Sequence, residues 1–182
     1  ILNSNGGGAT ASVNVAENGA AVTTVAASDA DLPAQTLSYS ISGGADAALF
    51  SINPTTGVLS FNSAPNFEAP TDAGANNVYD VTVQVADGNG GTDTQAIAVS
   101  VTNVNEAPII TSNGGGVTAA VSAAENQIAV TTVTSTDVDG GSAVYSIAGG
   151  ADAALITINA STGALTFKTA PNFEAPTDAG AD

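Results

Sequence analysis

The chain repeats itself at a spacing of about 108 residues, and this repeat constrains its fold more than any other feature. The two copies share the motifs Ser-Asn-Gly-Gly-Gly (4–8 and 112–116), Glu-Asn (17–18 and 125–126) and Pro-Asn-Phe-Glu-Ala-Pro (65–70 and 171–176). The offset is 108 for the first two motifs (112 − 4) and 106 for the third (171 − 65), because one loop of the second copy is two residues shorter. Solenoid repeats span only about 20 to 50 residues. The period therefore predicts whole domains in tandem.

Within the first copy, polarity alternates with period two in seven short runs, each bounded by Gly, Asn, Asp or Pro. This pattern predicts β-strands, at residues 9–15, 22–28, 37–42, 49–52, 58–61, 78–86 and 92–102. The sequence 54–57 is typical of a turn, 87–91 of a hairpin loop, and 45–49 of one short helical turn. The predicted fold class is all-β, a tandem of Greek-key β-sandwiches with seven strands in each complete repeat.

We divide the chain into a complete repeat at 1–108, which includes a linker at 103–108, and a second repeat at 109–182. Pro108 fixes its own φ and favours an extended residue before it, so the linker is predicted to be straight. At the offset of 106, Asp182 corresponds to Asn76, so the second copy is truncated before its last two strands. We expect five strands there, beside an open slot that further chain or a neighbouring copy would fill.

The charge of the chain is strongly one-sided. Seventeen Asp and Glu face a single basic residue, Lys168, for a formal net charge of −16. This excludes nucleic acid as a partner, because nucleic-acid binding requires Lys and Arg, and it disfavours an anionic membrane surface. It favours a hard divalent cation that takes oxygen ligands, although solubility alone is an alternative explanation of the same charge.

The residue types that are missing narrow the chemistry further. The chain has no Cys, Met, His or Trp, so thiol catalysis, soft-metal sites and the usual general base are excluded. No apolar run approaches the roughly 20 residues that span a bilayer, and no membrane insertion is expected. Asp29 and Asp31 are a conceivable pair of catalytic carboxylates, but alternate residues of one loop form no substrate cleft. We predict a protein that is not an enzyme.

Six motifs in this order resemble the cadherin repeat, in its bacterial form, over essentially the whole chain. They are Ala16-Glu17-Asn18, Ser28-Asp29-Ala30-Asp31, Tyr39-Ser40-Ile41 with Phe50-Ser51-Ile52-Asn53 and Thr56-Gly57, Asn66-Phe67-Glu68, Val83-Gln84-Val85-Ala86-Asp87, and Asn103-Val104-Asn105-Glu106-Ala107-Pro108. The resemblance implies an extracellular or cell-surface location and Ca²⁺ at each junction between consecutive repeats.

Carried over by position, the resemblance assigns three groups of calcium ligands. The junction would use Glu17, Glu68, Asn66, Asn103, Asn105 and Glu106 together with Asp137 and Asp139 of the second repeat. The same upper half-site in the first repeat would be Asp29, Asp31 and Asp87, and a lower half-site in the second would be Glu125, Asn172 and Glu174. Asn66 and Asn103 stand where the family usually has Asp, which keeps an oxygen ligand but removes a charge.

The residues themselves also favour a cation. Unpaired carboxylates about 4 Å apart repel by roughly 1 kcal/mol even in water. The junction would bring together five acids with no Lys or Arg nearby to pair them: Glu17, Glu68, Glu106, Asp137 and Asp139. The alternative is that they are turn and cap residues on solvated loops, where Asp and Asn are common. The loop 87–93 alternates oxygen-bearing residues but lacks the terminal Glu of an EF-hand, so we interpret it as a plain hairpin in which Asp87 alone contributes to a site.

Two functions remain open at this point. The first is a structural spacer of a large secreted bacterial adhesin, filament or extracellular matrix protein, in which Ca²⁺ stiffens the junctions between repeats. The second is a binding module for homophilic cell adhesion or carbohydrate recognition. The expected partners are adjacent repeats of the same chain or neighbouring copies of it, with other cell-surface proteins or glycans as further partners.

Overall fold

A computed structural model describes residues 1–31, 33 and 35–179. The chain forms two compact units, Ile1–Val104 and Asn105–Asp182, which are described separately below.

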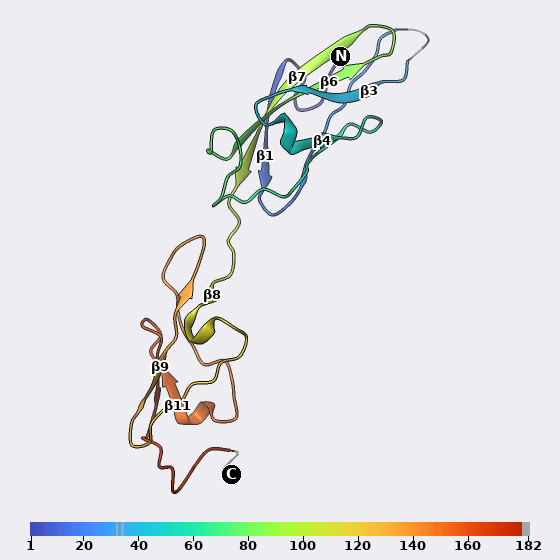
Figure 1. The fold of residues 1–182 in the computed structure, drawn as a ribbon. Helices are drawn as coiled ribbons and strands as arrows, with labels where there is room; N and C mark the ends of the chain where they lie inside the picture. The colour runs from blue at the N-terminus through green and yellow to red at the C-terminus, as the bar shows by residue number, and fades with distance from the viewer. Residues whose placement is uncertain (32, 34, 180–182) are drawn as a thin grey trace. The chain divides into compact units, whose positions relative to one another are not determined.

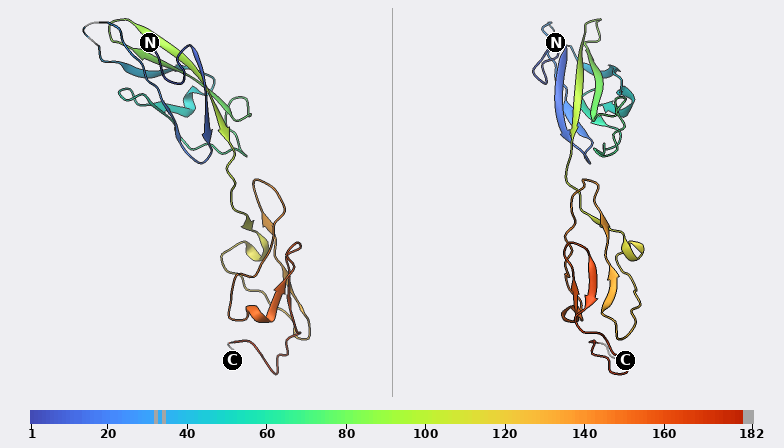
Figure 2. Two further views of the ribbon diagram at one scale, coloured as in Figure 1. Left: turned by 180° about the vertical axis from the view of Figure 1, so that it is seen from behind. Right: turned by 90° about the vertical axis from the view of Figure 1, so that its left-hand side faces the viewer.

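The first unit is a sandwich of two sheets (Figure 1). Its strands are β1 (Thr10–Ala16), β2 (Ala21–Thr24), β3 (Ser38–Gly43), β4 (Phe50–Ile52), β5 (Val58–Phe61), β6 (Val78–Ala86) and β7 (Thr92–Thr102). One sheet has the order β1-β7-β6-β3 and the other the order β2-β5-β4. β1 runs parallel to β7, and Figure 2 shows the two side by side. The predicted all-β sandwich with seven strands in the first repeat is confirmed.

The observed strand limits follow the predicted ones most closely where alternation is longest. β6 and β7 begin and end at the predicted residues. β2 ends at Thr24 instead of Ser28, because its partner β5 begins at Val58, opposite Thr24, and the chain then makes only an isolated bridge at Ala27. A 3₁₀ helix, η1 (Ala47–Leu49), takes the place of the predicted short turn and delays β4 to Phe50.

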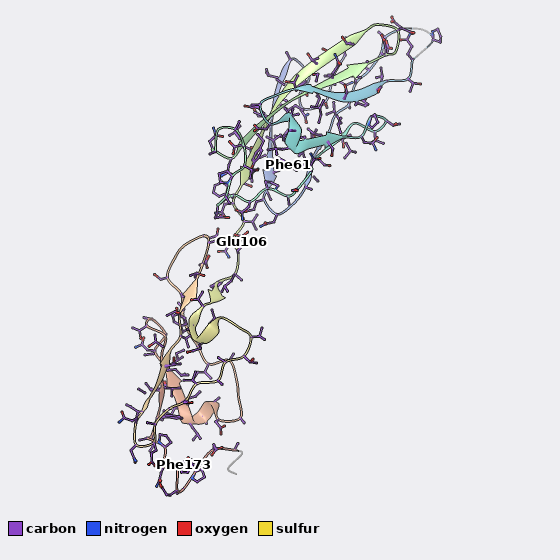
Figure 3. All side chains as sticks on the ribbon, viewed as in Figure 1. Phe61, Glu106 and Phe173 are labelled. Atoms are coloured by element: carbon purple, nitrogen blue, oxygen red, sulfur yellow. The ribbon has the colours of Figure 1, made fainter. Side chains whose placement is uncertain are left out.

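The core of the first unit lies between its two sheets. The inward positions of β6 and β7 are buried in alternation, as a half-buried sheet requires. At one end, the Tyr79 ring meets Phe61 edge-on with centroids 5.1 Å apart, and Phe61 stacks on Phe50 at 4.5 Å. Figure 3 labels Phe61 in this interior. Edge-on and offset ring contacts of this kind stabilise a core beyond the apolar area that they bury.

The second unit has fewer and shorter strands among its described residues. They are β8 (Ile109–Ile110), β9 (Ala129–Thr132), β10 (Ser135–Thr136), β11 (Ile156–Ile158) and β12 (Ala164–Phe167), with 3₁₀ helices η2 (Ser112–Gly114) and η3 (Ala153–Leu155). One sheet has the order β11-β12-β9, and β8 pairs with β10.

The sequence predicts five strands in the second unit, and the observed strands differ from the predicted ones. Segments 117–124 and 143–148 correspond to β1 and β3, and neither forms a strand in the part of the chain that the structure describes. In the first unit β1 pairs with β7 and β3 pairs with β6. No described residue of the second unit occupies those two places, so the backbone groups of both segments lack strand partners. Phe173, labelled in Figure 3, is 84% exposed, whereas its counterpart Phe67 packs against the core.

Candidate metal-binding clusters

Three carboxylates that the resemblance assigned to one half-site lie in a single cluster of the first unit. Asp29 and Asp31 lie in the loop after β2, and Asp87 begins the β6–β7 loop. Each offers an oxygen atom that lies within 4.8 Å of the other two. Local hydrogen bonds shape both loops, because Asp29 Oδ1 accepts the Asp31 N–H at 2.9 Å and Asp87 Oδ1 accepts the Asn89 N–H at 2.7 Å. Such turns are a common use of Asp side chains.

The electrostatics of this cluster favour a cation. The only basic side chain of the sequence, Lys168, lies in the second unit and donates to the Ala154 carbonyl at 2.7 Å. Among the described residues, the buried Asp29 Oδ2 has no hydrogen-bond partner. A buried carboxylate oxygen without a donor is costly. A hard divalent ion bound by oxygen ligands would satisfy that atom and relieve the repulsion.

A second group of predicted ligands lies where β1 and β7 end in the first unit. Glu17 is only 3% exposed, and its two oxygens accept the N–H groups of Phe67 at 2.7 Å and Val104 at 2.8 Å. A Glu68 carboxylate oxygen lies within 4.8 Å of one of Glu17, and the Asn103 amide donates to Glu68 at 3.2 Å. The structure therefore brings Glu17, Glu68 and Asn103 close together. Asn66 Oδ1 instead accepts the Ala69 N–H at 2.9 Å, which shapes its turn.

In the second unit the corresponding acids form an arrangement like that of the first. Asp137 Oδ1 accepts the Asp139 N–H at 3.1 Å, as Asp29 accepts the Asp31 N–H. Asp139 Oδ2 accepts the Glu106 N–H at 2.6 Å, while Asp139 Oδ1 is buried without a hydrogen-bond partner among the described residues. The Asn105 amide donates to the Glu106 carbonyl at 2.7 Å. Glu106, Asp137 and Asp139 are thus held at one end of this unit.

The lower predicted group of the second unit is more open. Glu125 Oε2 accepts the Phe173 N–H at 3.2 Å, a longer version of the bond between Glu17 and Phe67. Asn172 Oδ1 accepts the Glu174 N–H at 3.0 Å. Glu125 is exposed where Glu17 is buried, so its carboxylate is less constrained.

Sequence reasoning missed the buried carboxylates that organise the long loop before β6. Asp46 is 4% exposed and accepts the N–H groups of Ala73 at 2.7 Å and Asp80 at 2.8 Å. Asp72 is 6% exposed and accepts those of Asn76 and Asn77. A signal was present, because the sequence Gly-Gly-Ala-Asp-Ala-Ala-Leu recurs at 43–49 and 149–155. These carboxylates are satisfied by backbone donors, so their role is structural.

Gln95 is another buried polar residue that the alternation did not single out. Its amide is fully buried and donates to the Gly8 carbonyl at 2.9 Å, which ties the start of β7 to the Gly-rich segment. Nearby, the Leu2 N–H donates to Asp93 at 2.8 Å. That bond, and then the Thr94 N–H, lower the pKa of Asp93 below its ordinary value, while burial opposes the shift. Both residues attach the N-terminal segment to β7.

These features define a class of protein: an all-β sandwich with long loops that hold clustered carboxylates and almost no basic groups. Comparison with known proteins identifies that class. The model of the Cadherin domain matches residues 11–104, and the chain belongs to the cadherin family. The cadherin domain is a non-enzymatic adhesion fold, it typically binds Ca²⁺, and the chain is accordingly extracellular or at the cell surface. No helix in the described residues has the length and apolar character of a membrane span.

Individual relatives agree with this assignment. Cadherin-16 of Oryctolagus cuniculus is 34% identical over 132 residues, which is 66% of this chain but only 15% of the length of that protein. Human protocadherin-24 domains EC1-2 match with a TM-score of 0.54 at 22% identity, over 91% of this chain and 77% of that one. Human desmocollin-1 gives a TM-score of 0.51 at 23% identity, over 96% of this chain and 34% of that one. These structures share the fold, and the predicted cadherin-like sandwich is confirmed.

Proposed function

We propose that this chain is a calcium-stiffened structural spacer of a large secreted bacterial adhesin, filament or extracellular matrix protein. The observation that carries the proposal is the cluster of Asp29, Asp31 and Asp87, whose carboxylate oxygens lie within 4.8 Å of one another. Like charges so close repel unless a cation joins them. Calcium outside cells is abundant enough to fill even weak extracellular sites, with dissociation constants of about 10⁻⁴ to 10⁻³ M.

The proposed sites lie at the ends of each unit, where one repeat follows another. Glu17, Glu68 and Asn103 would supply the last ligands of the first repeat, and Asn105 with Glu106 those of the linker. Asp137 and Asp139 would complete the site from the second repeat. Ions shared in this way would restrict bending between repeats, so the proposed spacer is flexible without calcium and stiff with it.

The composition of the surface supports a spacer over a recognition module. Sugar binding commonly relies on exposed aromatic rings, yet the chain has no Trp, and in the first unit Tyr79, Phe50 and Phe61 are buried in the core. The exposed ring of Phe173 belongs to the second unit. Homophilic exchange of a first strand would require an apolar anchor, and β1 carries only Ala and Val among its apolar residues. Bacterial origin is part of the proposal and rests on the form of the repeat, which lacks cysteine and has Asn at two positions usually occupied by Asp.

A calcium titration tests the proposal. Melting temperature and radius of gyration should both rise between chelator and millimolar calcium at constant ionic strength. A free ligand concentration of 100 times the dissociation constant adds about 2.7 kcal/mol to the stability of the folded state. If neither quantity changes, the chain has no functional calcium site and the proposal is wrong.

Matched variants then locate the sites. Asp31→Asn and Asp87→Asn remove one charge each from the cluster of the first unit, while Asp80→Asn removes a charge from an exposed position on β6 outside it. Calcium affinity measured by isothermal calorimetry should fall in the first two variants and stay unchanged in the third. Asp137→Ala and Glu17→Ala should likewise weaken the proposed junction sites, with Asp152→Ala as their control. Equal losses in all variants would show that the ligands are assigned wrongly.

A further inference from the structure

Four Asn-Gly pairs occur in the chain, at 5–6, 18–19, 89–90 and 113–114. Asn-Gly is the dipeptide in which an asparagine most readily loses ammonia, because glycine has no side chain to obstruct attack by its own backbone nitrogen on the asparagine amide. The sequence alone gives no reason to separate the four pairs, since all are followed by small residues. The structure gives the four asparagines different backbone conformations and hydrogen bonds.

Three of the four asparagines are held in the left-handed conformation. Asn5, Asn18 and Asn113 have φ values of 50°, 64° and 53°, where few residues other than glycine lie and where the backbone is over-determined by its surroundings. The Asn5 Oδ1 accepts the Thr23 hydroxyl at 3.0 Å, and the Asn113 Oδ1 accepts the Thr131 hydroxyl at 3.1 Å. Rotation of the Asn5 or Asn113 side chain toward the backbone nitrogen of the following glycine would break these hydrogen bonds. In Asn18 the same rotation would disturb the left-handed backbone geometry.

Asn89 differs from the other three in its backbone conformation, and from Asn5 and Asn113 also in the hydrogen bonding of its side chain, whereas Asn18 and Asn113 are exposed as Asn89 is. It is exposed at the tip of the β6–β7 loop, and its φ is not in the left-handed region. Among the described residues, neither its side-chain amide nor the Gly90 N–H makes a hydrogen bond, although the Asn89 and Gly91 N–H groups on either side both donate to Asp87. No atom lies within 4 Å of the place where a Gly90 Cβ would stand, and the same is true of Gly6 and Gly114, so open space beside the glycine permits the reaction without separating these pairs.

We infer that Asn89 is the spontaneous deamidation site of this protein. The Gly90 nitrogen loses its proton and bonds to Cγ of Asn89, while the bond from Cγ to the amide nitrogen breaks and ammonia leaves. Water then opens the resulting cyclic imide at either carbonyl and gives aspartate or isoaspartate. In sum, one asparagine and one water become one carboxylate and one ammonium ion, so the loop gains one negative charge without any enzyme or oxidant.

The new carboxylate arises two residues from Asp87, and the isoaspartate product also lengthens the main chain of the loop by one atom. Both changes act beside the cluster of Asp29, Asp31 and Asp87. This consequence for cation binding rests on the proposed calcium sites. The deamidation of Asn89 does not rest on those sites, because it is measured in chelator. The deamidation site and the calcium sites can therefore be disproved independently.

To test this inference, the full chain is incubated in chelator at mildly alkaline pH. It is then digested with pepsin at low pH, which suppresses further reaction, and the products are mapped by mass spectrometry. Product at Asn89 should accumulate several-fold faster than at Asn5, Asn18 or Asn113. In denaturant the four sites should react at similar rates, because only the fold distinguishes them. The Asn89→Gln variant should lose the main acidic species seen on ion exchange.

Two results would contradict the inference. One is a native chain in which any of the other three asparagines reacts as fast as Asn89. The other is an Asn89→Gln chain that forms the acidic species at the rate of the unsubstituted protein. Separating isoaspartate from aspartate at position 89 confirms the imide route, because direct hydrolysis of the side-chain amide gives aspartate alone.

Discussion

Single carboxylates in this chain have two distinct roles. Asp46 and Asp72 are buried and fully engaged with backbone N–H groups, whereas Asp29 and Asp139 each keep a buried oxygen without a hydrogen-bond partner among the described residues. The first pair stabilises a loop by itself. The second pair is suited to a ligand that supplies positive charge.

Asp46 should be the most important carboxylate for the stability of the first unit. Asp46→Ala removes acceptors from the Ala73 and Asp80 N–H groups, and hydrogen bonds to charged partners contribute about 1.5 to 3 kcal/mol each. We expect a loss of about 2 to 4 kcal/mol in the free energy of unfolding, measured by urea denaturation. Among the described residues, the counterpart Asp152→Ala leaves only the Ala179 N–H without its acceptor, in a more exposed place, and should cost less. A larger loss in Asp152→Ala would refute this ranking.

Asp93 should make the stability of the first unit depend on pH in the acid range. Donation from Leu2 and then from Thr94 lowers its pKa in the folded state, so its contribution is present above the ordinary Asp pKa and disappears as pH falls through the lowered value. Asp93→Asn should therefore destabilise the chain at neutral pH and have little effect at pH values below that range. Urea unfolding at a series of pH values, with exposed Asp80→Asn as the control, measures the difference.

At the scale of strands and turns, alternation succeeded where partners exist within the same unit. It located both ends of β6 and β7, which lie in the middle of their sheet. It failed for segments 117–124 and 143–148, because a pattern specifies which face of a strand is apolar but cannot supply the neighbouring backbone that a ladder requires. It overestimated β2, which ends opposite Val58, the first residue of its partner β5.

The candidate sites, like the strands, could be predicted only in part from the sequence. The cluster of Asp29, Asp31 and Asp87 joins loops far apart in the sequence, and only the resemblance to a known repeat could bring them together. Asp46 and Asp72 were missed because an acid in a loop is usually solvated. What buries them is a set of backbone donors on a distant segment, and no local pattern contains that information.

The turn between β4 and β5 depends on a glycine. Gly57 has a φ of 70°, and a Cβ placed there would lie 2.1 Å from the Val25 carbonyl oxygen. Gly57→Ala should lower the free energy of unfolding by at least about 2 kcal/mol, since a strained φ and a clash with backbone combine. Gly19→Ala is the matched control, because Gly19 has no positive φ and its Cβ would lie 3.9 Å from the nearest atom. Equal melting temperatures for the two variants would contradict the prediction.

Over the whole molecule, the net charge of −16 opposes the compact state. In chelator, added sodium chloride should raise the melting temperature gradually, because salt screens repulsion between exposed charges. Calcium at equal ionic strength should raise it further, since specific sites add binding energy to screening. Magnesium, which demands a tighter octahedral geometry, should have a smaller effect than calcium. Identical curves for the three salts would mean that only screening operates.

The parallel pairing of β1 with β7 has a mechanical consequence. The chain enters β1 at Thr10, beside Ala96, and leaves β7 at Thr102, beside Ala16. A pull along the chain therefore drags β1 and β7 in opposite directions along their length, so the hydrogen bonds between them are loaded in shear and share the force instead of opening one after another. Resistance to such a pull is set by the rate of unfolding rather than by equilibrium stability. This strand pair thus determines how much tension the first unit can bear.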